Sequence, residues 1–174
     1  MNLRKRKPED RAAVEQLLTA ASLPVAGLER TEGWVVEEDR AVLGHVAVEL
    51  TPDVAVLRSL VVAPRAQGRC LGRRLLDHAE AQGGGRLLVL RTETVGPWVE
   101  RRGYRLTTVG QLPASVRATT QFEGDLCASC PVYAKGEAEP ASGAAASLEA
   151  SAAGPPEPRP QARGCCCGET GNEG

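Results

Sequence analysis

Apolar residues follow two different periods along the first 135 residues of this chain. Near the N-terminus, Val14, Leu17 and Ala21 recur at helical spacing and predict a helix from about residue 8 to residue 22. Shorter runs rich in valine and leucine predict β-strands. These runs cover residues 3–7, 33–37, 41–50, 54–62, 87–90 and 104–109, and residues 130–134 are expected to form a last, edge strand.

Three more segments are predicted to be helical. Leu71, Leu75 and Ala79 lie on one helix face that ends at three consecutive glycines, residues 83–85. Residues 97–102 suit a short helix, and residues 113–121 suit one more. Because consecutive strands precede the central helix, the order predicts a mixed α/β sandwich and not a Rossmann repeat.

The last 38 residues differ in composition from the rest of the chain. Of residues 137–174, 29 are Ala, Gly, Pro, Ser or Glu, and Leu148 is the sole large aliphatic residue. Such a segment cannot bury enough apolar surface to offset the entropy lost on ordering. We therefore expect a folded domain over residues 1–136 and a disordered tail over 137–174.

Charge and composition narrow the class of protein. A net charge of −1 gives no indication of a nucleic-acid or membrane-surface partner. No apolar run approaches the roughly 20 residues of a membrane span, and the basic N-terminus lacks the apolar segment of a secretory signal. The six cysteines are then expected to be reduced thiols in a cytoplasmic protein.

The segment that joins strand 54–62 to the next helix carries the clearest chemical signal. It reads Gln67-Gly68-Arg69-Cys70-Leu71-Gly72, and Arg73 and Arg74 follow. A helix N-terminus presents unpaired N–H groups to an anion, and the glycines allow a phosphate to approach the backbone. The alternative is an ordinary strand–helix turn with a solvated basic face.

This loop resembles the acyl-CoA loop of GCN5-related N-acetyltransferases (GNAT), and the block Trp98 to Tyr104 is similar to that family's downstream aromatic block. The resemblance implies an α/β fold with a mixed, mostly antiparallel central sheet flanked by helices. It also implies acetyl-CoA as co-substrate. By position, the pantetheine arm pairs with the strand before the loop, and the pyrophosphate lies on the loop. The implied residues are Leu60, Val61, Val62, Gln67, Gly68, Arg69, Cys70, Leu71, Gly72 and Arg73.

Two positions depart from the family pattern. Cys70 stands where the family usually has glycine, and it would crowd the phosphates if the backbone there needed a positive φ. We expect an ordinary helical φ, which makes the cysteine a modest steric change. Val99 stands where the family often has the tyrosine that protonates the leaving thiolate.

Acetyl transfer to an amine needs a base for the amine proton. Glu49 and Glu93 are the candidate catalytic bases, and His45 is a further one, although a solvated strand end or a core-edge position is the favoured interpretation of each. Four residues beside the central strands could bind an anionic substrate, and for Arg58 an ion pair with a nearby acid is the alternative. They are Arg58, Arg91, Thr92 and Thr94.

A narrower resemblance covers residues 57–62, 91–94 and 113–131, which are similar to segments of arsenic-resistance acetyltransferases. It implies detoxification by acetylation, with an amino acid-like or organoarsenical substrate. Cys127 and Cys130 have a spacing compatible with a soft metal or a redox pair, and the favoured alternative is one buried and one loop cysteine without such a role. The triplet Cys165, Cys166 and Cys167 is a candidate site for a thiophilic metal or metalloid, and an unstructured thiol tag is the alternative.

The sequence therefore predicts an acetyl-CoA-dependent N-acetyltransferase that acts on a small-molecule amine in arsenic resistance. A different class stays open: a catalytically weak module of the same fold that binds acyl-CoA or a metalloid as a sensor or carrier. A homodimer is a further expectation from the resemblance, since such proteins often pair through terminal strands.

Overall fold

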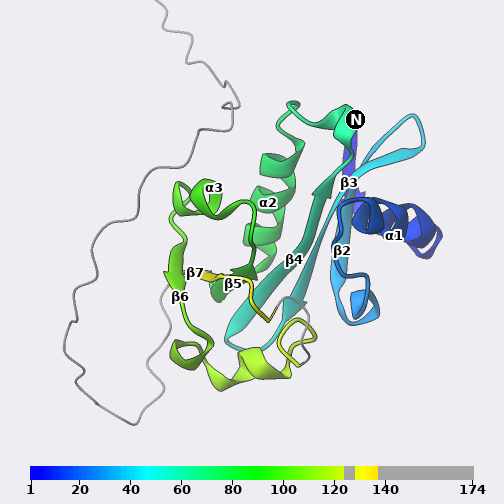
Figure 1. Ribbon diagram of the computed structural model, residues 1–174. Helices are drawn as coiled ribbons and strands as arrows, with labels where there is room; N and C mark the ends of the chain where they lie inside the picture. Colours follow the sequence, from blue (N-terminus) through cyan, green and yellow to red (C-terminus); the bar gives the residue numbers. More distant parts are fainter. Residues whose placement is uncertain (124–127, 137–174) are drawn as a thin grey trace, which may run out of the picture. The chain divides into compact units, whose positions relative to one another are not determined.

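The computed structural model describes residues 1–123 and 128–136 (Figure 1). The predicted tail, including Cys165, Cys166 and Cys167, and also Cys127, lies outside the described residues. Within them, strands form a sheet in the order β1-β2-β3-β4-β5-β7-β6. Their bounds are β1 Asn2–Lys5, β2 Glu32–Glu38, β3 Ala41–Leu50, β4 Val54–Val62, β5 Leu87–Arg91, β6 Arg105–Thr107 and β7 Val132–Lys135.

Every pair of neighbouring strands in this sheet is antiparallel except β4–β5, which is parallel. The mixed, mostly antiparallel sheet predicted from the resemblance is thus confirmed. β2 and β3 form a hairpin joined by Asp39 and Arg40, which both have positive φ, as a two-residue type I′ turn requires.

Three α-helices and several 3₁₀ turns complete the described fold. The helices are α1 Arg11–Ala20, α2 Leu71–Gln82 and α3 Gly96–Glu100. The 3₁₀ turns span Pro8–Asp10, Leu28–Arg30, Pro64–Ala66, Val109–Gln111 and Ala114–Ala118. No helix in residues 1–123 or 128–136 is long and apolar enough to cross a membrane.

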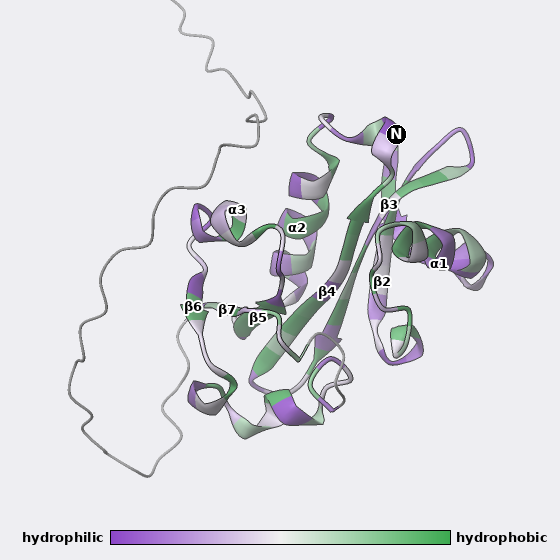
Figure 2. Cartoon of the chain, in the orientation of Figure 1, coloured by the Kyte–Doolittle hydropathy of each residue, from purple (hydrophilic) through white to green (hydrophobic). Residues whose placement is uncertain are grey.

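Figure 2 shows largely hydrophobic residues along the central strand β4. Because alternate residues of a strand face opposite sides of the sheet, such strands supply apolar side chains to both sides. On one side, Val46 and Leu57 pack against α2 and α3. On the other side, Ala47 packs against α1, while Val54 and Val56 pack against the 3₁₀ turn at residues 114–118. Figure 1 shows α1 and α2 on opposite sides of the central strands.

Two sequence predictions about the C-terminal part need correction. The strand at residues 132–135 is not an edge strand, because β7 lies between β5 and β6. The helix expected over residues 113–121 shrinks to the 3₁₀ turn Ala114–Ala118. It ends there because the N–H of Thr120 donates to the Glu49 carboxylate rather than to a helical carbonyl, at 3.0 and 3.1 Å.

Candidate active site

The parallel strands β4 and β5 separate halfway along β4. Their Cα pairing runs from Val54 opposite Leu87 to Leu57 opposite Leu90, and β5 ends one residue later. β4 continues to Val62 beside β3 alone. A stretch of β4 backbone on the β5 side is therefore open to pair with an extended ligand, and it includes the predicted residues Leu60, Val61 and Val62.

A β-bulge lies where the two strands separate. The β3–β4 register passes from His45 opposite Val61 to Ala47 opposite Arg58, so two β4 residues stand where β3 has one. One of the two, Ser59, has a φ of 55°. A left-handed conformation costs a residue other than glycine about 1–2 kcal/mol, and bulges of this kind redirect a strand.

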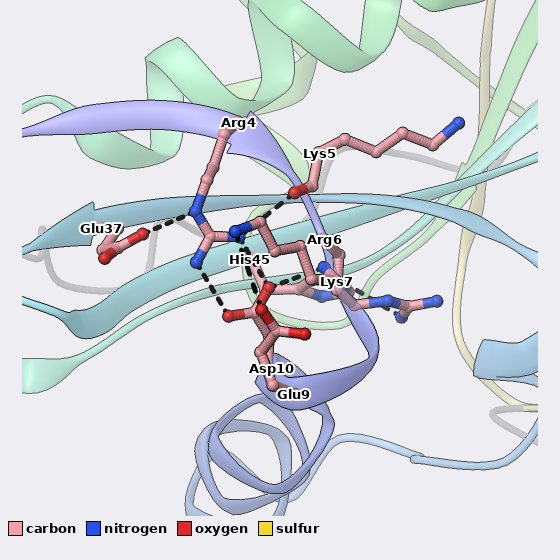
Figure 3. Close-up of polar contacts among 8 residues, drawn as sticks. All are labelled: Arg4, Lys5, Arg6, Lys7, Glu9, Asp10, Glu37 and His45. Carbon is pink, nitrogen blue, oxygen red and sulfur yellow. Dashed lines mark hydrogen bonds and ion pairs between the residues drawn. The ribbon is translucent and has the colours of Figure 1, made fainter.

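His45 holds the carbonyl of this bulge residue. Its Nδ1 lies 3.1 Å from the Ser59 carbonyl oxygen, and its Nε2 lies 3.4 Å from the Arg6 Nη1 (Figure 3). A carbonyl accepts and a guanidinium donates, so the ring is the neutral Nδ1–H tautomer. Burial and, to a smaller extent, the nearby Arg6 charge lower the pKa of His45 to about 4. Fully buried with both nitrogens engaged, His45 is a core residue and not a base.

The predicted anion loop follows β4 directly. Gly68 has a φ of 77°, α2 begins at Leu71, and a Cβ placed on Gly68 would meet no atom within 4 Å. The N–H groups of Gly68, Arg69 and Gly72 donate to no backbone carbonyl of the described chain. Unpaired donors beside open space suit a pyrophosphate, so the loop fits the phosphate end of acyl-CoA.

The helical φ predicted for Cys70 was wrong. Its φ of 57° and ψ of 17° are left-handed, not helical, because it is the N-cap of α2, a position outside the helical geometry. The family's glycine at this position is explained by that backbone conformation. The Cys70 side chain is exposed.

The arginines of the loop differ in their partners. Arg69 makes a bidentate ion pair with Glu38 at the end of β2, with N···O distances of 2.8 and 3.0 Å. That contact lowers the pKa of Glu38. Arg73 lies 3.7 Å from Asp77 one helical turn later, and Gln67 donates to the Val62 carbonyl at 3.3 Å. Arg69 thus fastens the loop to the β2–β3 hairpin.

Arg58 lies where the two strands separate and is buried. Its guanidinium donates to the Thr120 hydroxyl at 2.6 Å and to the Ala26 carbonyl at 2.7 Å. The same hydroxyl donates to Glu49 at 2.5 Å. Thr120 therefore links Arg58 to Glu49, the acid predicted as a base. Both carboxylate oxygens of Glu49 accept hydrogen bonds from Thr120.

Two segments far apart in the sequence meet over this network. Arg30 bonds Glu123 at 2.5 Å and the Ala118 carbonyl at 3.1 Å, and a Cβ on Gly27 would lie 2.8 Å from Thr120. We call residues 26–30 the front loop and residues 118–123 the strap. The strap lies within the narrower resemblance found in the sequence, but the role of Thr120 was not predicted. That role depends on contacts across 62 and 71 residues.

The remaining predicted residues lie on or after β5. The Arg91 guanidinium carbon is 4.2 Å from the ring centroid of Phe122 in the strap. The Thr92 hydroxyl accepts the N–H groups of Thr94 and Val95, so it shapes the loop before α3. Glu93 and Thr94 are exposed in that loop, and among the described residues no hydrogen bond or ion pair joins Glu93 to Glu49.

A tyrosine that sequence reasoning missed lies beside α3. Tyr133 of β7 is on the same sheet row as Leu57 and Leu90, the last row before the strands separate. A Cβ on Gly96 would lie 2.4 Å from its hydroxyl oxygen. Gly96 and Val99, three residues apart, are both buried. The Tyr133 hydroxyl therefore lies by the first turn of α3, the helix that carries Val99, and it has no hydrogen-bond partner among the described residues.

The chain's other tyrosine has a structural role. Burial and the nearby Glu80 carboxylate raise the pKa of Tyr104 well above its usual value, and its hydroxyl donates to Glu80 at 3.3 Å. As for metals, the described residues contain no group of three or more His, Cys, Asp or Glu side chains placed to hold an ion. The thiol triplet is outside the residues to which this applies.

Comparison with known proteins finds a matching family model and similar acetyltransferases. The model of the acetyltransferase (GNAT) domain matches residues 29–106. An amino-acid acetyltransferase of Ralstonia nicotianae is 39% identical over 89 residues, which is 48% of this chain and 20% of that protein. The chain thus spans about a fifth of the length of this curated relative.

Similar solved structures include the following two. A GNAT family acetyltransferase from Brucella melitensis, in complex with acetyl-CoA, is 30% identical with a TM-score of 0.51, over 60% of this chain and 82% of that one. N-acetylglutamate synthase from Neisseria gonorrhoeae, complexed with coenzyme A and L-arginine, is 20% identical with a TM-score of 0.62, over 77% of this chain and 32% of that one. The second likeness speaks for the fold alone.

Proposed function

Because this chain belongs to the GNAT acetyltransferase family, we propose that it transfers the acetyl group of acetyl-CoA to the amine of a small, carboxylate-bearing molecule. The observation that carries the proposal is the open edge of β4. It begins where β5 stops pairing, and it leads into a loop in which the N–H groups of Gly68, Arg69 and Gly72 donate to no backbone carbonyl of the described chain.

The residues of this chain have distinct parts in the proposed reaction. Acetyl-CoA supplies the activated acetyl thioester. The loop from Gln67 to Arg73 would hold the pyrophosphate by backbone N–H groups and by the positive end of α2. The β4 backbone from Leu60 to Val62 would hold the extended arm by main-chain hydrogen bonds. The β4 edge is paired with β3 and the loop is joined to β2 by the Arg69–Glu38 ion pair, and a site held in place before binding loses less entropy on binding.

The acceptor is proposed to carry a carboxylate. Arg58 and Arg91 come from neighbouring strands at the point of separation, and the strap covers both through Thr120 and Phe122. Arginine suits planar carboxylates because it can donate two parallel hydrogen bonds. The activity of the Ralstonia relative, an amino-acid acetyltransferase, supports the same class of acceptor.

The proton carriers stay proposals. Glu49 and Glu93 are the candidate bases for the amine, and Glu49 also holds the strap. For the leaving thiolate we add Tyr133 as candidate acid, because its hydroxyl lies at the inner face of α3 without a partner in the described chain. Val99 cannot donate a proton, so the family's usual residue does not serve here.

The predicted role in arsenic resistance stays a prediction. An amino acid-like organoarsenical would satisfy the same arginines as an ordinary amino acid, so the two acceptors must be compared directly. The triplet Cys165 to Cys167 is proposed to bind trivalent arsenic through its thiolates. Titration of the full chain and of a chain shortened before residue 137 tests this: equal arsenite binding by both would contradict the proposal.

A second function, non-catalytic binding of acyl-CoA, is favoured by two observations. Cys70 puts a side chain at a left-handed position of the phosphate loop, and Val99 removes the usual acid. The test is a thiol-release assay of the full chain with acetyl-CoA and a panel of amines. The panel comprises amino acids, amino acid-like arsenicals, a peptide N-terminus and aminoglycosides.

The proposed function predicts turnover that is fastest with a carboxylate-bearing amine. Binding of acetyl-CoA without turnover on any amine would favour the non-catalytic module. An aminoglycoside or a peptide as the best acceptor would contradict the proposed carboxylate, and the absence of acetyl-CoA binding would contradict both functions.

A further inference from the structure

We propose that His45 is a positioning residue that locks the β4 bulge and so keeps the open β4 edge in the shape needed to bind acyl-CoA. The inference rests on the proposed function, since it assigns the bulge a role in that site. It concerns a side chain that does not reach the ligand itself and that sequence reasoning considered as a base.

The bulge needs a specific contact to persist. Ser59 adopts a φ of 55°, which an L-residue with a side chain disfavours. Such strain persists where the surroundings determine it. β5 cannot supply the contact, because its pairing with β4 ends at Leu57. The side chain that meets the Ser59 backbone is that of His45, on the opposite strand.

His45 is itself fixed from three sides. Its Nδ1–H donates to the Ser59 carbonyl at 3.1 Å, and Arg6 donates to its Nε2 at 3.4 Å. A Cβ on Gly33 would lie 2.9 Å from that Nε2, so the glycine on β2 provides the space for the ring. The lock therefore runs from the segment after β1 across β2 and β3 to β4.

Arg6 ties this lock to the front loop region. Its Nη2 donates to the Leu28 carbonyl at 2.7 Å and to the Thr31 carbonyl at 3.3 Å (Figure 3 shows Arg6 beside His45). With its donors used on carbonyls and on the imidazole, Arg6 keeps His45 in the tautomer that can donate to Ser59. The side chains thus hold one backbone carbonyl at the point where β4 leaves β5.

A double-mutant cycle on the full chain tests the lock, with unacetylated CoA as the probe. The variants are His45→Ala, Ser59→Gly and the double variant, measured by calorimetric titration and thermal unfolding. Glycine adopts a positive φ without strain, so the bulge should no longer need the histidine once Ser59 is replaced. Val54→Ala, a fully buried change on the same strand far from the bulge, is the matched control.

We expect His45→Ala to weaken CoA binding about tenfold in the natural background and less than about threefold in the Ser59→Gly background, a coupling that additive sites do not show. Val54→Ala should lower the unfolding temperature but cost the same affinity in both backgrounds. If His45→Ala does not fold, His45→Gln replaces it, with smaller losses and the same dependence on background.

Equal losses from His45→Ala in both backgrounds would overturn this inference and leave the proposed function standing. A natural chain that bound no CoA would overturn both. Rescue of CoA affinity by Ser59→Gly, with an unfolding temperature still lowered, would support the lock, because a general loss of stability does not restore binding.

Discussion

At the scale of single residues, the site depends on backbone conformations that side chains disfavour. Cys70 and Ser59 are both left-handed, and they lie at the two ends of the open β4 edge and its loop. One is the N-cap of α2, and the other is the bulge where β4 separates from β5. Strain of this kind is found where a functional geometry is held by its surroundings.

Replacing Cys70 by glycine should stabilise the protein. Glycine removes the cost of the left-handed backbone, about 1–2 kcal/mol, and loses part of that gain to the greater freedom of the unfolded chain. We expect a net gain of about 0.5–1 kcal/mol in the free energy of unfolding by urea denaturation. CoA affinity should be equal or higher. A less stable variant would contradict the assigned backbone strain.

Replacing Tyr133 by phenylalanine should slow turnover without weakening CoA binding. Loss of a general acid typically costs 10²–10⁴-fold in rate, and we expect kcat to fall about 100-fold. Tyr104→Phe is the matched control, because that hydroxyl is bonded to Glu80. If both variants lost the same activity, or if Tyr133→Phe kept full kcat, Tyr133 would not be the acid.

Replacing Arg91 by glutamine should raise KM for a carboxylate-bearing amine. An arginine–carboxylate contact inside a site is worth about 2–3 kcal/mol, so KM should increase about 30-fold or more while the Kd for CoA stays unchanged. Arg117→Gln, an exposed change in the nearby 3₁₀ turn, is the control. An increase of the same size for an amine without a carboxylate would contradict the anion-binding role.

At the scale of elements, the proposed acceptor side is made by two irregular segments rather than by regular structure. The front loop and the strap are joined by Arg30, and both meet the buried Arg58. Thr120 is the central contact, because its hydroxyl accepts from Arg58 and donates to Glu49. The strap therefore substitutes for the helix that the sequence predicted there.

Replacing Thr120 by valine should loosen this junction. The shape is kept, but two buried charged groups lose a hydrogen-bond partner, and each such loss costs about 1–3 kcal/mol. We expect a drop of about 2 kcal/mol in the free energy of unfolding and a higher KM for the acceptor. Thr19→Val, an exposed change on α1, is the control. An unchanged free energy of unfolding would mean that the hydrogen bonds of the Thr120 hydroxyl do not stabilise the protein.

At the scale of the whole molecule, local patterns predicted much of the scaffold. The strands at 41–50 and 54–62 were predicted with their observed bounds, because unbroken apolar runs and polar turns mark them. The glycine-bearing loop also lies where the pattern indicated. The place of β7 between β5 and β6 was not predictable, since it depends on pairing across more than 40 residues rather than on its own four.

The candidate site was less predictable than the scaffold. The loop and the β4 edge could be located by resemblance, but the φ of Cys70 is a property of a cap that composition does not reveal. The contacts of His45 with Arg6 and of Arg58 with Thr120 span 39 and 62 residues. Such long-range contacts decide whether a polar residue is a base, a substrate contact or a core residue.

The central claim is that the open β4 edge and its loop bind acyl-CoA. The most direct test is calorimetric titration of the full chain with acetyl-CoA. The variant Gly72→Val, which places a larger side chain in the loop, is titrated in the same way. We predict a single site with a Kd of about 1–100 μM, weakened at least about tenfold by Gly72→Val. No binding to the natural chain, or equal binding to both chains, would contradict the account.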